Sequence, residues 1–152
     1  MTNGDFLMSK SQRIVLLFLC LSILSISAMA QSTNYSVNLS ANKFLGSYLV
    51  NQSGFALYYY SSDSSAGGAS ACYGDCASTW KPFYAEKITL PDSLNFADFA
   101  AISRTDGSKQ TTFKGWPLYL YSRDEAAGDV YGNGKENGLW HVVNPMDQSQ
   151  LF

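Results

Sequence analysis

A ten-residue segment of this chain occurs twice, and the duplication constrains the fold more than any other feature. Residues Gly54–Asp63 read GFALYYYSSD, and residues Gly115–Asp124, 61 positions later, read GWPLYLYSRD. Both copies fit the pattern Gly-aromatic-x-Leu-Tyr-x-Tyr-Ser-x-Asp. A tryptophan follows at nearly the same distance, 22 positions after Tyr58 and 21 positions after Tyr119. Self-similarity at a fixed offset indicates a duplicated structural unit.

Each copy has the residue pattern of a β-strand. Phe55, Leu57 and Tyr59 would share one face of a strand, and the residues between them would share the other. A period of two in an aromatic-rich segment is typical of a strand. Asp63 and Asp124 end the copies, where a carboxylate can accept backbone N–H groups in an Asx-type turn. We predict that the two aspartates are equivalent, structural turn caps; a tyrosine–carboxylate surface that binds a ligand such as a sugar is the alternative. The motif residues are Tyr58, Tyr60, Asp63, Tyr119, Tyr121 and Asp124.

The segments around the two copies extend this pattern to a complete unit. Ser47–Gly54 and Thr111–Gly115 each predict a strand followed by a turn into the motif strand. The predicted fold is therefore mainly β, with two pseudo-repeated hairpin-plus-Trp-strand units at about residues 47–85 and 108–145. These units would form one small barrel or sandwich. Between them, the Pro-Asp start and apolar spacing of Asp92–Ile102 predict one short helix.

The first 30 residues predict a signal peptide. A basic segment that includes Lys10 precedes the apolar run Ile14–Ile26, and Ala28-Met29-Ala30 has the form of a cleavage site. Translation from Met1 or from Met8 fits this arrangement. We expect cleavage after Ala30, which makes the protein secreted, either extracellular or periplasmic. An uncleaved segment kept as a membrane anchor is the alternative.

The predicted mature chain consists of a flexible leader, residues 31–43, and one β-rich domain, residues 44–152. Removing Lys10, Arg13 and Asp5 from ten basic and twelve acidic residues leaves eight and eleven, a formal charge of −3. This mildly acidic balance without basic clusters argues against nucleic acid as a partner. Three asparagines fit the N-glycosylation pattern: Asn34, Asn38 and Asn51.

Two closely spaced cysteines, Cys72 and Cys76, remain after removal of the signal segment. In an exported chain an even number of cysteines implies a disulfide. Three residues separate the two, unlike the Cys-x-x-Cys of thioredoxin-like enzymes. We therefore expect a structural bridge, with a redox-active bridge as the alternative.

No cofactor or metal is expected from the polar residues of the chain. The Gly-rich segment Gly128–Gly138 contains Asp and Asn, but its spacing does not match the calcium loop of EF-hands. Turn formation explains this composition more simply. His141 is the single histidine, and one histidine with two bridged cysteines does not make an ordinary zinc site.

These motifs together resemble the secreted-repeat lipoprotein family, which has a Tyr-x4-Asp motif and no known function. The resemblance rests on both motif copies, Cys72-Tyr73-Gly74-Asp75-Cys76-Ala77 with Trp80, Arg104–Gly107, and Gly138-Leu139-Trp140, and it spans about Leu49 to Pro145. The chain departs from the family pattern at Lys81-Pro82 and at Trp116, where Pro-Pro and His are common. The resemblance implies a secreted β-rich repeat domain and supplies no catalytic residues.

The residue patterns favour a binding or assembly role over an enzyme. No Gly-x-Ser-x-Gly elbow accompanies His141. Asp63 and Asp124 would suit a glycosidase pair only if their environments differed, and their motif contexts are the same. The expected partner is an envelope glycan or another envelope protein, with membrane contact only through an uncleaved signal segment. The alternative function is an accessory role in extracellular redox or metal handling.

Overall fold

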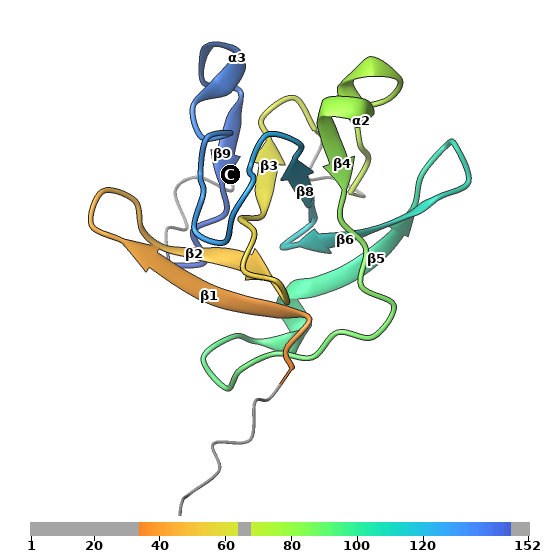
Figure 1. Ribbon diagram of the computed structural model, residues 1–152. Coiled ribbons are helices and arrows are strands. Elements are labelled where there is room, and N and C mark those ends of the chain that lie inside the picture. Colours follow the sequence, from red (N-terminus) through yellow and green to blue (C-terminus); the bar gives the residue numbers. More distant parts are fainter. Residues whose placement is uncertain (1–33, 64–67, 147–152) are drawn as a thin grey trace, which may run out of the picture. The chain divides into compact units, whose positions relative to one another are not determined.

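The computed structural model describes residues 34–63 and 68–146, so the predicted signal peptide lies outside the described residues (Figure 1). The described chain is mainly β, as predicted, with three antiparallel sheets and two short α-helices. These ranges do not close into a barrel, and the three sheets fit a sandwich-like arrangement. The strands are β1 (Val37–Asn42), β2 (Gly46–Asn51), β3 (Tyr58–Tyr60), β4 (Trp80–Pro82), β5 (Phe99–Ser103), β6 (Lys109–Phe113), β7 (Trp116–Pro117), β8 (Tyr119–Tyr121) and β9 (Trp140–Val142).

The central four-stranded sheet joins the two units of the duplication. Its order is β4-β8-β3-β9, with the two motif strands β3 and β8 in the middle and Tyr58 paired with Tyr119 (Figure 1). The Trp-bearing strand β4 of the first unit pairs with β8, and β9 of the second unit pairs with β3. Every strand pairing in this sheet therefore connects one unit to the other.

Each unit also has its own hairpin, β1–β2 in the first and β5–β6–β7 in the second. The prediction of a flexible leader was wrong for Val37–Asn42. These residues form β1, and every residue of β1 pairs with a residue of β2. The overlooked signal is alternation: Val37, Leu39 and Ala41 alternate with polar residues. Val37 is fully buried and Leu39 packs on the core, so burial of this face holds the strand.

The predicted helix at Asp92–Ile102 was also wrong. Only the 3-10 turn η1 (Phe96–Asp98) is helical, and Phe99 begins β5. Phe99 pairs with Phe113 of β6, and the ring centroids are 5.0 Å apart. The apolar spacing of this segment fits a helix, but pairing with β6 buries Phe99 and leaves Phe96 65% exposed. Tertiary pairing thus outweighs the local helical pattern.

Equivalent sets of backbone hydrogen bonds tie each hairpin to the central sheet. At the first hairpin, Leu49 donates to Val143 of the second unit at 2.8 Å, Val143 donates to Leu57 at 2.9 Å, and Leu57 donates to Leu49 at 2.9 Å. The same circuit recurs at the second hairpin, where Phe83 of the first unit bonds with Thr111 and Leu118. The units are therefore related by approximate twofold symmetry in their hydrogen bonding.

Two apolar clusters fill the space between the sheets. One side of the central sheet contributes to a cluster beside the hairpins: Val37, Leu49, Leu57, Tyr59, Phe83, Phe99, Phe113, Leu118 and Val143. The other side carries an aromatic cluster: Tyr48, Val50, Ala56, Tyr58, Cys72, Trp80, Tyr119, Tyr121, Trp140 and Val142. The alternation of the motif strands divides their side chains between these clusters.

Candidate functional site

The motif tyrosine of each unit hydrogen-bonds the motif aspartate of the other unit. The hydroxyl of Tyr58 donates to Oδ2 of Asp124 at 2.7 Å, and the hydroxyl of Tyr119 donates to Oδ2 of Asp63 at 2.7 Å. Both tyrosines are fully buried, and the aspartates are only 5% and 7% exposed. The duplicated motif therefore forms two crossed contacts between the units.

The second oxygen of each motif aspartate accepts a backbone N–H group. Asp63 accepts from Ala71 at 2.7 Å, and Asp124 accepts from Tyr131 at 3.0 Å. These donors lie eight and seven residues after the aspartates. The aspartates thus fasten the long loops that follow the motif strands, rather than the short Asx-type turn that the sequence suggested. Their hydrogen-bond partners are of the same kinds, but Arg104 acts on Asp63 whereas Asp129 acts on Asp124.

Burial dominates the electrostatics of these pairs. Removal from water raises the pKa of Asp63 and of Asp124 above the usual range, although their hydrogen bonds act in the opposite direction. Burial also raises the pKa of Tyr58 and of Tyr119, and the neighbouring carboxylates contribute to both shifts. The neighbouring charges differ, because Arg104 lowers the pKa of Asp63 whereas Asp129 raises the pKa of Asp124.

Four aromatic rings form a continuous stack across the two units. Tyr60 stacks on Trp140 with centroids 4.3 Å apart, Trp140 stacks on Trp80 at 3.8 Å, and Trp80 lies 4.4 Å from Tyr121. The two tryptophan planes differ by 5°. Successive rings in the stack come alternately from the first and the second unit. Every contact in the stack therefore joins one unit to the other.

The two tryptophans differ in the hydrogen bonding of their indole N–H groups. Nε1 of Trp80 donates to Oε1 of Glu136 at 3.1 Å, whereas the buried Nε1 of Trp140 has no acceptor among the described residues. Glu136 stands four residues before Trp140, and the residue four before Trp80 is Cys76. Glu136 and the bridged Cys76 thus occupy equivalent positions in the two units. The second unit supplies a carboxylate acceptor for Trp80, and the first unit supplies none for Trp140.

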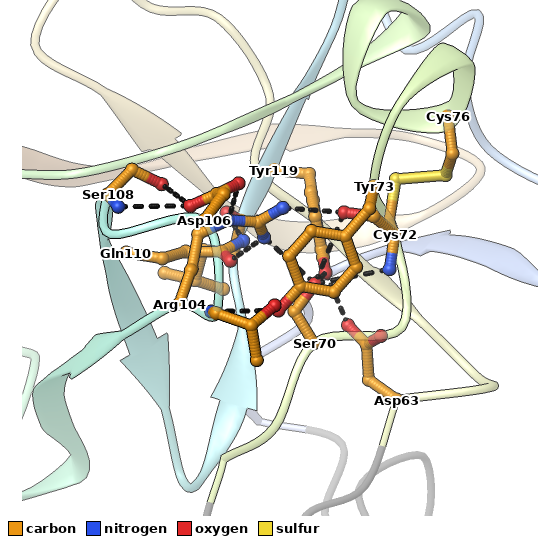
Figure 2. A network of polar contacts seen from close by, with 12 residues as sticks. Asp63, Ser70, Cys72, Tyr73, Cys76, Arg104, Asp106, Ser108, Gln110 and Tyr119 are labelled. Atoms are coloured by element: carbon orange, nitrogen blue, oxygen red, sulfur yellow. Dashed lines mark hydrogen bonds and ion pairs between the residues drawn. A yellow bond between two sulfur atoms is a disulfide. The ribbon is translucent and has the colours of Figure 1, made fainter.

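Arg104 lies at the centre of a buried polar network (Figure 2). Its side chain is 0% exposed. The guanidinium donates to Oγ of Ser70 at 2.8 Å, to Oε1 of Gln110 at 2.5 Å and to the carbonyl of Cys72 at 2.6 Å. Its Nε is 3.3 Å from Asp106. Arg104 lies in a segment that resembles the family, but its role does not follow from the sequence, because burial of an arginine is a tertiary property.

A directed chain of hydrogen bonds connects Arg104 to the motif. Tyr119 uses its proton for Asp63, so the hydroxyl of Ser70, 2.7 Å from that of Tyr119, must donate to it. Arg104 in turn donates to Ser70. These hydrogen bonds connect the buried cation of Arg104 through two hydroxyl groups to the buried carboxylate of Asp63. The two buried charges therefore compensate each other.

The predicted disulfide between Cys72 and Cys76 is confirmed, with an S–S distance of 2.04 Å. The closed loop begins α2 (Asp75–Thr79) and places the ring of Tyr73 over the guanidinium of Arg104, 4.4 Å from the ring centroid. Figure 2 shows the bridge beside this network. The bridge therefore supports the residues that hold Arg104.

The chain matches a known protein family twice, once in each unit. A family model described as a secreted repeat of unknown function matches residues 40–84 and 100–144. The chain belongs to this secreted-repeat family. Each match begins in a hairpin and extends to the Trp-bearing strand, so the predicted duplication is confirmed. No curated protein and no solved structure matches the chain.

The remaining predicted sites of this secreted-repeat protein lie apart from the network. Asn34 and Asn38 are exposed, whereas Asn51 is half-buried and its Oδ1 accepts the N–H groups of Ser53 and Phe55. Across residues 34–63 and 68–146, no three His, Cys, Asp or Glu side chains form a group that could hold a metal ion. No helix within the same ranges has the length and apolar character needed to cross a membrane.

The second-unit loop and the histidine have local structural partners. In the Gly-rich loop, Asp129 accepts the N–H groups of Glu125 and Ala126. This loop leads into α3 (Lys135–Gly138), the counterpart of α2. His141 stacks on Tyr59 with centroids 5.3 Å apart, and its Nε2 is 2.6 Å from the carbonyl oxygen of Gly138.

Proposed function

We propose that this secreted-repeat protein is a non-enzymatic binding domain of the cell envelope or extracellular space. In this proposal the duplicated motif is a scaffold and the ligand binds elsewhere on the surface. The observation that carries it is the crossed pairing of Tyr58 with Asp124 and of Tyr119 with Asp63. These polar groups satisfy one another in the interior, so they are not presented to a ligand.

The burial and the matching hydrogen-bond partners of the two motif aspartates support the non-enzymatic part of the proposal. A glycosidase needs one carboxyl group that donates a proton and one that stays ionised, which requires different surroundings. Asp63 and Asp124 each accept one tyrosine hydroxyl and one backbone N–H group. The partner expected on chemical grounds is an envelope glycan or another envelope protein.

A second candidate function is favoured by the aromatic stack. Closely stacked tryptophan and tyrosine rings, beside tyrosines hydrogen-bonded to carboxylates, suit an accessory role in extracellular redox or metal handling. The ultraviolet-visible spectrum and metal content of protein purified from its native source separate the candidates. A stoichiometric metal or a visible absorption band would support the redox role.

The binding proposal is tested by capture on envelope fractions. Purified mature protein, immobilised through its C-terminus, should retain a defined envelope glycan or protein. Matched protein carrying Asp63→Asn should retain the same partner wherever it is still folded, because the bond between Asp63 and Tyr119 supports the fold. Loss of capture by a variant with an unchanged circular dichroism spectrum would contradict the assignment of the motif as scaffold.

A further inference from the structure

Two surface hollows meet at the turn that leads into the first motif strand. The first, about 370 Å³, is lined by this turn and by residues 83–87. The second, about 310 Å³, is lined by the same turn together with Phe55, Lys81 and the end of β8. Asn51 and Ser53 line both hollows. The two hollows therefore share this turn as a wall, and the turn with both hollows is called the groove below.

The turn that shapes this groove is where the two units differ. Leu49 and Thr111 make equivalent backbone hydrogen bonds in the two units. Two residues further on, Asn51 of the first unit therefore corresponds to Phe113 of the second. Phe113 is 1% exposed in the core, whereas Asn51 is half-buried and its side chain caps its own turn. From these residues to the glycine that opens each motif, the turn has four residues in the first unit and three in the second. The turn therefore differs between the units, although both units line the groove, and Lys114 and Gly115 at the corresponding turn line a separate hollow of about 370 Å³.

The lining of the groove has the chemistry of a carbohydrate site. Tyr84, which is 37% exposed and has Lys109 Nζ 5.8 Å from its ring centroid, lines the first hollow, and the half-buried Phe55 lines the second. Aromatic faces suit the apolar faces of sugar rings, and a tyrosine adds a polar group at its rim. The turn residues Asn51, Gln52 and Ser53 add amide and hydroxyl groups between the rings. A few polar groups placed around aromatic surface are typical of small-molecule sites.

The charges along the groove favour a neutral ligand. The first hollow has Glu86 together with Lys87. The second has Lys81 beside the buried Asp124, whose oxygens accept the Tyr58 hydroxyl and the N–H of Tyr131. Each hollow therefore pairs one basic with one acidic side chain. Neither hollow provides the single-sign field that would select an anionic or a cationic chain.

The backbone of the groove wall argues against an added peptide strand. Peptides that extend a sheet need free N–H and C=O groups on an edge strand. Pro82 has no N–H group. Phe83 already donates to Leu118 and accepts from Thr111, and the N–H of Ala85 donates to the hydroxyl of Thr111. These backbone groups face their own fold.

We propose that this groove binds a neutral, extended oligosaccharide, with Tyr84 and Phe55 against the sugar rings and the Asn51–Ser53 turn bonding the hydroxyl groups. The inference rests on the proposed binding function and names the class of its ligand. The two hollows place the rings on opposite sides of the turn, so an oligosaccharide that spans both binds more tightly than a single sugar.

The test uses the mature secreted protein and a panel of neutral hexasaccharides built from β-1,4-glucose, α-1,4-glucose, β-1,4-mannose or β-1,4-N-acetylglucosamine. Binding is measured by amide-resonance titration and calorimetry. At least one hexasaccharide should shift the amide resonances of residues 51–53 and 84–87 and bind more tightly than its monosaccharide. Tyr84→Ala should weaken this binding by about tenfold or more. The matched control Tyr131→Ala removes a 61% exposed tyrosine outside the groove and should change affinity by less than about twofold.

A second pair of variants guards against indirect effects: Phe55→Ala should weaken binding, and Phe96→Ala, at a 65% exposed phenylalanine, should not.

No binding of any panel member at about 10 mM would overturn the groove assignment. Tighter binding of an acidic hexagalacturonate would overturn its neutral specificity. Binding that shifts amides elsewhere and survives Tyr84→Ala would refute the groove but leave the proposed binding function standing. Failure to capture any envelope component would instead count against the proposed function itself.

Discussion

Double-mutant cycles on the motif residues should show coupling between the units and none within a unit. Tyr58 contacts Asp124 of the other unit at 2.7 Å, while Asp63, in its own unit, bonds Tyr119. Hydrogen bonds to charged groups contribute about 1.5–3 kcal/mol. The coupling free energy of Tyr58→Phe with Asp124→Ala should therefore be about 1.5–3 kcal/mol. The cycle of Tyr58→Phe with Asp63→Ala is the matched control and should give less than about 0.5 kcal/mol.

The single substitutions set the scale of the experiment. Each Asp→Ala change removes two hydrogen bonds to a carboxylate, one from a tyrosine and one from a backbone N–H group, which sums to roughly 3–6 kcal/mol. For a domain of this length that corresponds to a fall of about 9–36 °C in melting temperature. Asp63→Ala and Asp124→Ala should be similar, because their partners are equivalent. Tyr58→Phe and Tyr119→Phe should cost less, because each aspartate keeps its backbone donor.

Urea and thermal unfolding, followed by circular dichroism, measure these free energies. Equal coupling in the cross-unit and same-unit cycles would refute the crossed arrangement. A large loss of stability in only one of the two aspartate variants would show that the copies are not equivalent, and it would direct attention to the other aspartate as a functional residue.

Four further predictions concern packing, titration, oxidation and processing. In unfolding measurements, Gly132→Ala should destabilise by about 1–3 kcal/mol, since a Cβ there would lie 2.9 Å from Trp80 and Tyr58. Replacing both motif aspartates by asparagine should flatten the pH dependence of stability above the ordinary aspartate pKa of about 3.9. Their raised folded-state pKa values make the native protein lose stability as pH rises through that window. Without reductant, an alkylating reagent should label neither Cys72 nor Cys76, and reduction should cost about 2 kcal/mol for so short a loop. The intact mass of secreted protein should correspond to a chain that begins after Ala30; a species that keeps the apolar run would contradict the predicted cleavage.

The local patterns of the chain predicted its elements better than their partners. Alternation in the motif and the turn before it correctly predicted mainly-β units, and cysteine spacing predicted the bridge. The crossing of the units was beyond sequence reasoning, because a duplicated motif pairs equally well within or between units on local grounds. The same limit hid β5, whose helical spacing is overridden by pairing with β6. β1 differs, since its alternation was visible but was outweighed by the polar composition of the segment.

The candidate site shows the same limit. Tyr58 and Asp124 were singled out from the motif, yet their contact joins residues 66 positions apart. Arg104 could not be distinguished from a surface arginine, because its burial depends on Ser70, Gln110 and the disulfide loop meeting around it. The groove likewise depends on where the Asn51–Ser53 turn lies relative to residues 83–87.

The hydroxyl protons of the motif tyrosines test the crossed arrangement most directly. In protein labelled with 13C at the tyrosine ring, both protons should exchange slowly enough to be observed, because Tyr58 and Tyr119 are fully buried and hydrogen-bonded. Asp124→Asn should shift the hydroxyl resonance of Tyr58 and leave that of Tyr119 in place, and Asp63→Asn should do the reverse. If each substitution instead shifts the tyrosine of its own unit, the units do not hold one another through the motif and the account is wrong.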